Sequence, residues 1–123
     1  MARISIGTMV LGLLIAICCT ATIAHSKEWT VGDAKGWSFR VAGWESGLAI
    51  HTGDTLVFKY NPKEHNVVQV DEKSYNACSV SGRLSGDYNS GNDHIRVGRG
   101  KSFFICSFAG HCEQGMKIAI TPE

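Results

Sequence analysis

The hydrophobic positions after residue 26 fall into short runs in which apolar and polar residues alternate, a pattern typical of β-strands. Long helical periodicity is absent, and turn signals such as Gly-Asp and Asn-Pro separate the runs. So many strands in so short a chain predict an all-β fold, an antiparallel Greek-key β-sandwich or barrel. The predicted strands span residues 29–31, 55–60, 65–70, 94–97, 102–106 and 116–120.

Two local features add to this pattern. Residues 72–79, EKSYNACS, predict a short helix, so we expect one or two short helices beside the strands. Gly98-Arg99-Gly100 separates two strand-like runs and predicts a hairpin turn between them. The chain contains no internal repeat and no low-complexity linker, so we expect a single small domain.

The first 26 residues have the composition of a secretory signal peptide. Arg3 lies near the start, an apolar run covers residues 9–17, and small residues follow it. The alternative is a transmembrane anchor, but the apolar run is short for a bilayer span. Cleavage could follow Ala24 or Ser26. We therefore expect a signal peptide at 1–26 and a secreted domain at 27–123 that has no membrane span.

The charge of this domain is balanced. Loss of Arg3 lowers the number of basic side chains from 12 to 11, and all 11 acidic side chains lie after residue 26. A neutral domain without runs of like charge attracts neither nucleic acid nor an anionic membrane. The C-terminal KIAITPE has no polar stalk and no hydrophobic tail, so we expect no lipid anchor there.

Three cysteines remain in the domain, namely Cys78, Cys106 and Cys112. In an oxidising compartment two of them can form a disulfide, and the third then needs protection because a free exposed thiol oxidises or cross-links. Metal coordination gives that protection because the metal binds the thiolate. The odd number of cysteines therefore indicates one disulfide and one metal ligand.

The spacing around Cys106 indicates which metal. Cys106, His111 and Met116 follow the pattern Cys-x4-His-x4-Met, which can bring a thiolate, an imidazole and a thioether to one point. Such soft donors favour copper, and a blue-copper site adds a second imidazole. His65, at the start of the strand predicted at 65–70, is the candidate. Each of these residues alone has an ordinary structural interpretation, and the metal prediction depends on their combination.

This assignment also predicts the disulfide. If Cys106 binds copper, Cys78 and Cys112 are left to pair with each other. Cys112 directly follows His111, so the disulfide would hold the ligand loop against the region of Cys78. His51 and His94 have no companions of this kind, and we interpret both as surface residues.

The domain resembles the phytocyanins, the plant branch of the cupredoxins, and within them the plantacyanin or basic blue group. The residues that carry the resemblance cover nearly the whole domain. They are W-T-V-G-D at 29–33, G-W at 36–37, T-G-D-T-L-V-F-K-Y-N-P at 52–62, H-N-V-V at 65–68, Cys78, S-G-N-D at 90–93, and F-F-I-C-S-F-A-G-H-C-E-Q-G-M-K-I-A-I at 103–120.

The resemblance implies a cupredoxin fold and one type 1 copper that transfers single electrons by cycling between Cu(II) and Cu(I). The family's ligand positions fall on His65, Cys106, His111 and Met116, and its disulfide falls on Cys78 and Cys112. Asn66 is expected beside the ligands, where its hydrogen bonds would support them. The resemblance also implies an unidentified redox partner that docks near His111 and an extracellular or cell-wall (apoplast) location. A monomer is the default expectation.

Two departures from the family are visible. Ala109 stands two residues before the second histidine, where related loops commonly have proline. The family is usually basic, whereas this domain is formally neutral, so no partner is expected to be selected by positive charge.

Other classes of function fit less well. The chain could be an extracellular cell-wall binding or signalling protein, with a reproductive or developmental role, in which copper is structural. A hydrolytic enzyme using Cys106 and His111 lacks a third orienting residue at a recognisable spacing, so we expect no enzyme. Zinc is disfavoured because methionine is a poor zinc ligand.

Overall fold

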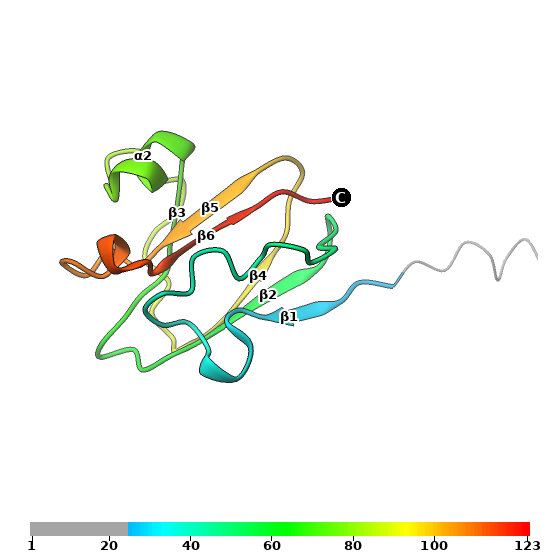
Figure 1. Cartoon of the computed structure of the whole chain (residues 1–123), viewed down its shortest axis with the longest axis horizontal. Helices are drawn as coiled ribbons and strands as arrows, with labels where there is room; N and C mark the ends of the chain where they lie inside the picture. Colours follow the sequence, from blue (N-terminus) through cyan, green and yellow to red (C-terminus); the bar gives the residue numbers. More distant parts are fainter. Residues whose placement is uncertain (1–24) are drawn as a thin grey trace, which may run out of the picture.

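A computed structural model describes residues 25–123 of the chain (Figure 1). Residues 1–24, which make up most of the predicted signal peptide, lie outside the described part. Within 25–123, no helix has the length and apolar character needed to cross a membrane. The described elements are β1 (Glu28–Thr30), η1 (Asp33–Lys35), β2 (Thr55–Lys59), β3 (Val68–Val70), α2 (Glu72–Ala77), β4 (Asn92–Arg96), β5 (Ser102–Ile105), η2 (Cys112–Gln114) and β6 (Lys117–Ile120).

The strands form two three-stranded sheets, which confirms the predicted all-β class. One sheet has the order β1-β2-β4 and the other the order β3-β5-β6. The chain passes from one sheet to the other after β2, after β3 and again after β4, as Figure 1 shows. Most neighbouring strands are antiparallel, but β1 pairs with β2 in parallel, with Glu28 opposite Thr55. A fully antiparallel sandwich was therefore the wrong expectation for the edge formed by β1.

Aromatic side chains join the two sheets in a common core. Phe58 of β2 packs edge-on against Trp37, with ring centroids 5.0 Å apart, and lies 5.5 Å from Phe104 of β5. All three side chains are almost fully buried. Burial of rings of this size is a major part of the stabilisation of a small domain. The core also contains Cys106 and Met116, so two of the predicted copper ligands are part of it.

The hairpin predicted at Gly98–Gly100 does not form. β4 pairs with β2, whereas β5 pairs with β3 and β6, so the strands on either side of this turn belong to different sheets. The chain does bend at residues 99–100, but each flanking strand pairs with the strand beside which it can bury its apolar side chains. Asp93 and Ile95 are the buried positions of β4, and Ile95 and the following Val97 belong to the core.

The strand predicted at 65–70 is shorter than expected. β3 begins at Val68, and Val67 makes only an isolated bridge with Tyr88. His65 follows the turn at 62–64 and lies outside the ladder. The helix predicted at 72–79 is present as α2, because the side chain of Asp71 accepts a hydrogen bond from the Ser74 N–H and caps its first turn.

Candidate metal centre

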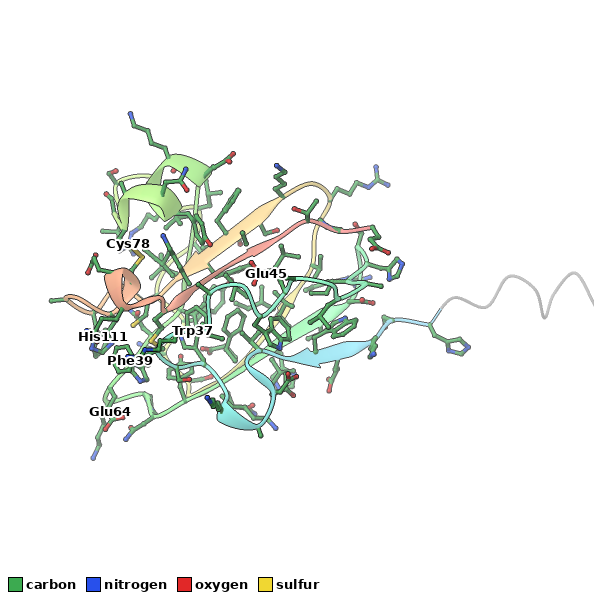
Figure 2. All side chains as sticks on the ribbon, in the orientation of Figure 1. Trp37, Phe39, Glu45, Glu64, Cys78 and His111 are labelled. Atoms are coloured by element: carbon green, nitrogen blue, oxygen red, sulfur yellow. A yellow bond between two sulfur atoms is a disulfide. The ribbon has the colours of Figure 1, made fainter. Side chains whose placement is uncertain are left out.

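Two loops at one end of the sandwich bring the four predicted ligands together. His65 precedes β3, Cys106 follows β5, His111 comes directly before η2, and Met116 comes directly before β6. In Figure 1 the loop between β5 and β6 lies at the left end of the molecule, and Figure 2 shows His111 there beside Phe39. His65 lies 41 or more residues before the other three candidates in the sequence. The pairing of β3 with β5 places it beside them.

The donor atoms of three of these residues converge. His65 Nδ1 lies 3.0 Å from His111 Nδ1, and Cys106 Sγ lies 3.6 Å from His111 Nδ1. One donor atom from each of the three residues lies within 4.8 Å of the other two. His65 and Cys106 are buried and His111 is half-buried. A buried thiol and two imidazoles that point at one another form a donor set suited to a soft metal ion such as copper.

Met116 lies in the same cluster and is held by the backbone. Its N–H donates to the carbonyl of His111 at 3.2 Å, and its carbonyl accepts from the N–H of Cys106 at 3.1 Å. The side chain is fully buried in the core that contains Cys106. These two hydrogen bonds hold the backbone of Met116 beside Cys106 and His111. This position is consistent with a thioether ligand.

The environment shifts the pKa values of two of these groups. Burial raises the pKa of the Cys106 thiol, and the backbone N–H groups of Asn66 and Phe108 oppose that change. Burial lowers the pKa of His65, and the neighbouring His111 lowers it further. A neutral His65 leaves a lone pair free for a metal, whereas Cys106 must lose its proton when a metal binds.

Asn66, which was expected beside the ligands, connects the two ligand loops. Its Oδ1 accepts a hydrogen bond from the Ser107 N–H at 2.9 Å, and its Nδ2 donates to Ser107 Oγ at 2.8 Å. Its carbonyl accepts from the indole N–H of the buried Trp37 at 2.9 Å. Because Asn66 follows His65 and Ser107 follows Cys106, these bonds tie both ligand candidates to the core.

The structure contains the predicted disulfide between Cys78 and Cys112. The S–S distance is 2.03 Å and the two Cα atoms are 5.6 Å apart. Cys78 ends α2, so the bridge fastens the loop after His111 to that helix. Within residues 25–123 the one free cysteine is Cys106, and it is buried. Glu113 lies close to the bridge, but disulfide sulfurs carry no thiolate to bind a metal.

Sequence analysis missed Phe39. Its ring centroid lies 5.4 Å from that of His65 and 4.7 Å from that of His111, so it covers both imidazoles edge-on. Phe39 lies in an irregular segment without alternation, and strand patterns therefore say nothing about its position. The available signal was an aromatic residue two positions after the core Trp37 in a segment otherwise rich in small and polar residues.

Comparison with known proteins agrees with this site. A family model described as "Plastocyanin-like domain" matches residues 29–116. Chemocyanin from Lilium longiflorum is 46% identical over 114 residues, which cover 92% of this chain and 90% of the relative. Basic blue protein from Arabidopsis thaliana is 42% identical over 120 residues, which cover 98% of this chain and 90% of the relative.

Solved structures show the same fold. The cucumber basic protein, a blue copper protein, superposes with a TM-score of 0.74 at 41% identity, covering 78% of this chain and 99% of that one. Spinach plantacyanin superposes with a TM-score of 0.65 at 50% identity, covering 72% of this chain and 94% of that one. The chain therefore belongs to the phytocyanins, plastocyanin-like blue copper proteins with one type 1 copper that carry electrons and are not enzymes.

Proposed function

We propose that this chain is a secreted carrier of single electrons in which His65, Cys106, His111 and Met116 hold the copper. The observation that carries the proposal is the convergence of the buried Cys106 thiol with two imidazoles. When bound, copper supplies reversible one-electron chemistry between Cu(II) and Cu(I). The ligand assignment and the secretion by a signal peptide at 1–26 form part of the proposal.

The protein's own contribution is to hold the donors still. The Asn66–Ser107 hydrogen bonds, the Cys78–Cys112 disulfide and the core below them restrict movement of the ligand loops. A rigid donor set keeps its arrangement when the charge at the site changes, so little rearrangement opposes electron transfer. The N–H groups of Asn66 and Phe108 at the Cys106 sulfur stabilise its negative charge and so contribute to the redox potential.

We further propose that electrons pass through the surface around His111. Phe39 and Phe108 lie beside this imidazole, and their side chains are 41% and 37% exposed. Small apolar surfaces suit short-lived redox encounters, because they release a partner readily. An unidentified redox partner would dock here on a monomeric carrier in the extracellular space or cell wall.

Optical and EPR spectra of residues 27–123, refolded with the disulfide formed and given one equivalent of Cu(II), test the function. We expect an intense visible thiolate-to-copper band that ascorbate bleaches and an oxidant restores. Cys106→Ser and His65→Ala should abolish the band, whereas His94→Ala, which changes an exposed histidine, should retain it. A pale spectrum from the unmodified chain would contradict the proposal.

A second candidate function is extracellular binding or signalling, with copper as a structural component. It is favoured by two features that use no copper-ligand side chain. The disulfide fastens η2 to α2, and the aromatic core joins the two sheets. A Cys106→Ser variant that folds but binds no blue copper separates the two functions. Retention of the biological effect by this variant would favour signalling, and loss of the effect would favour electron transfer.

A further inference from the structure

Asp54 carries a buried carboxylate to which, among residues 25–123, no cationic group is bonded. Its side chain is 3% exposed and lies at the start of β2. Its Oδ1 accepts from the backbone N–H of Lys27 at 3.0 Å. Its Oδ2 accepts from the indole N–H of Trp29 and from the backbone N–H of His51, both at 2.9 Å. These hydrogen bonds offset the cost of burying the carboxylate, and a positive charge on one of the donors would stabilise it further.

Both backbone polar groups of Lys27 are hydrogen-bonded. Its nitrogen donates to Asp54, and its carbonyl accepts from the Thr55 N–H at 2.9 Å. The parallel ladder begins at the next residue, with Glu28 opposite Thr55. Among hydrogen bonds between described residues, those nearest the N-terminus are made by Lys27. The folded domain therefore begins at this residue.

We propose that the signal peptide is cleaved between Ser26 and Lys27 and that the α-ammonium group so released binds the carboxylate of Asp54. A secretory endopeptidase catalyses the hydrolysis. The amide bond from the Ser26 carbonyl to the Lys27 nitrogen breaks, water supplies the hydroxyl group of the new carboxylate, and the amine takes up a proton. The hydrogen bond already present between Lys27 N and Asp54 Oδ1 then becomes an ion pair.

The sequence before this bond fits the cleavage. Ser26 and Ala24 place small residues at the first and third positions before the bond, as signal peptidases require. Cleavage after Ala24 would leave Lys27 N as an uncharged amide, and Asp54 would remain without a bonded cation. Charge complementarity therefore distinguishes two cleavage sites that composition alone does not.

The surroundings leave room for an ammonium group. Asp54, His51 and Arg96 line a cavity of about 430 Å³ together with residues 25 and 26, which the proposed cleavage removes. An ammonium at Lys27 could use this space to hydrate the N–H groups that do not reach Asp54. The charged or titratable groups nearby are Arg96 and His51 at this cavity, the Lys27 side chain, which lies over the Trp29 ring at 4.0 Å, and the exposed Glu28, which lies 3.8 Å from His94. The site lies at the end of the sandwich opposite the copper loops (Figure 1).

The first test identifies the N-terminus of the protein secreted from the full-length chain, by intact mass and N-terminal sequencing. We expect the protein to begin at Lys27. A start at His25, or at any residue after Lys27, would overturn the proposal.

The second test measures the pKa of the α-amine by NMR in the chain that begins at Lys27. We expect a value at least about one unit above the ordinary 7.7–8.0, because an adjacent carboxylate favours the charged amine. Asp54→Asn should return the pKa to the ordinary range, whereas Glu28→Gln, which removes an exposed acid close by, should leave it raised. An ordinary pKa in the unmodified chain would overturn the ion pair.

A third measurement remains informative if Asp54→Asn does not fold. A chain that begins at Ser26 retains the amide at Lys27, so its melting temperature at pH 7 should lie below that of the chain beginning at Lys27. A group with a raised native pKa stabilises the fold below its unfolded pKa and loses that effect as the pH rises through the native value. The difference should therefore vanish at high pH, and equal melting temperatures at pH 7 would contradict the proposal.

Discussion

Asn66 and Ser107 hold each other through two hydrogen bonds across 41 residues of sequence. One bond satisfies a backbone N–H and the other joins the two side chains. The same two residues directly follow His65 and Cys106. The distance between the two loops that supply the imidazole and the thiol is thus set by a polar contact outside the ligand set. This relationship leads to the first prediction.

Asn66→Ala should destabilise the protein by about 1–3 kcal/mol, because it removes both hydrogen bonds and leaves the half-buried Ser107 N–H without its acceptor. Copper should also be released faster to a chelator, since the two ligand loops lose their link. Urea unfolding of the copper-free protein and chelator kinetics measure the two effects. Ser107→Ala is the matched control, because it removes only the side-chain bond and keeps the bond from the Ser107 N–H to Asn66 Oδ1, so its cost should be smaller. Equal effects of the two substitutions would contradict this role of Asn66.

Phe39→Ala should lower the redox potential and speed copper release. The ring covers both imidazoles, and its removal admits water, which stabilises the more highly charged Cu(II) state. The effect on the free energy of unfolding should be small because the side chain is half-exposed. Cyclic voltammetry and chelator kinetics test the prediction, with Phe39→Leu as a control that keeps an apolar cover. An unchanged potential in Phe39→Ala would show that this cover is unimportant.

Met116→Gln should retain copper and lower the potential. The harder amide oxygen of glutamine favours Cu(II) over Cu(I) relative to a thioether. Voltammetry of the substituted protein, checked for copper content, measures the shift. A raised potential would argue against ligation by Met116.

Replacing both Cys78 and Cys112 with serine should lower the free energy of unfolding by about 2–5 kcal/mol. The bridge closes a loop with a sequence separation of 34, and its removal increases the freedom of the unfolded chain. Copper binding should weaken as well, because the loop after His111 loses its attachment to α2. Denaturant unfolding and the intensity of the visible copper band test these two effects. A double variant as stable as the unmodified chain would contradict the first.

Stability at acid pH should depend on Asp54. Burial acts to raise the pKa of its carboxyl group, but hydrogen bonds from Trp29, His51 and Lys27 outweigh it, so the pKa lies below the ordinary 3.8. A lowered native pKa gives stability above about 3.8 that is lost as the pH falls through the native value. Asp54→Asn should therefore be less stable than the unmodified chain at pH 7, and the difference should shrink below about pH 4.

Urea unfolding of the copper-free protein at several pH values measures this effect without interference from metal release. Asp33→Asn serves as the control, because Asp33 is an exposed acid near the same edge of the domain. A difference between Asp54→Asn and the unmodified chain that stayed constant with pH would show that the contribution is not electrostatic.

Local pattern was sufficient for much of the fold and of the site. Alternation located the six described strands within a few residues, and the segment at 72–79 was expected to form the short helix that the structure shows as α2. The three cysteines and the Cys-x4-His-x4-Met spacing led to the Cys78–Cys112 disulfide, which the structure contains. They also led to a ligand set whose three nitrogen and sulfur donors lie together. These features depend on residues that are close in the sequence, or on the number and type of metal-binding side chains.

Contacts between distant segments required the tertiary structure. The turn at Gly98–Gly100 joins two sheets and not one hairpin, because strand partners are chosen by burial of a shared core. Phe39 reaches His111 from an irregular segment, and Lys27 reaches Asp54 across a parallel ladder. Periodicity records which face of a strand is buried, but not what lies against it. Those partners are decided by how the whole chain packs, where side chains far apart in sequence compete for the same space.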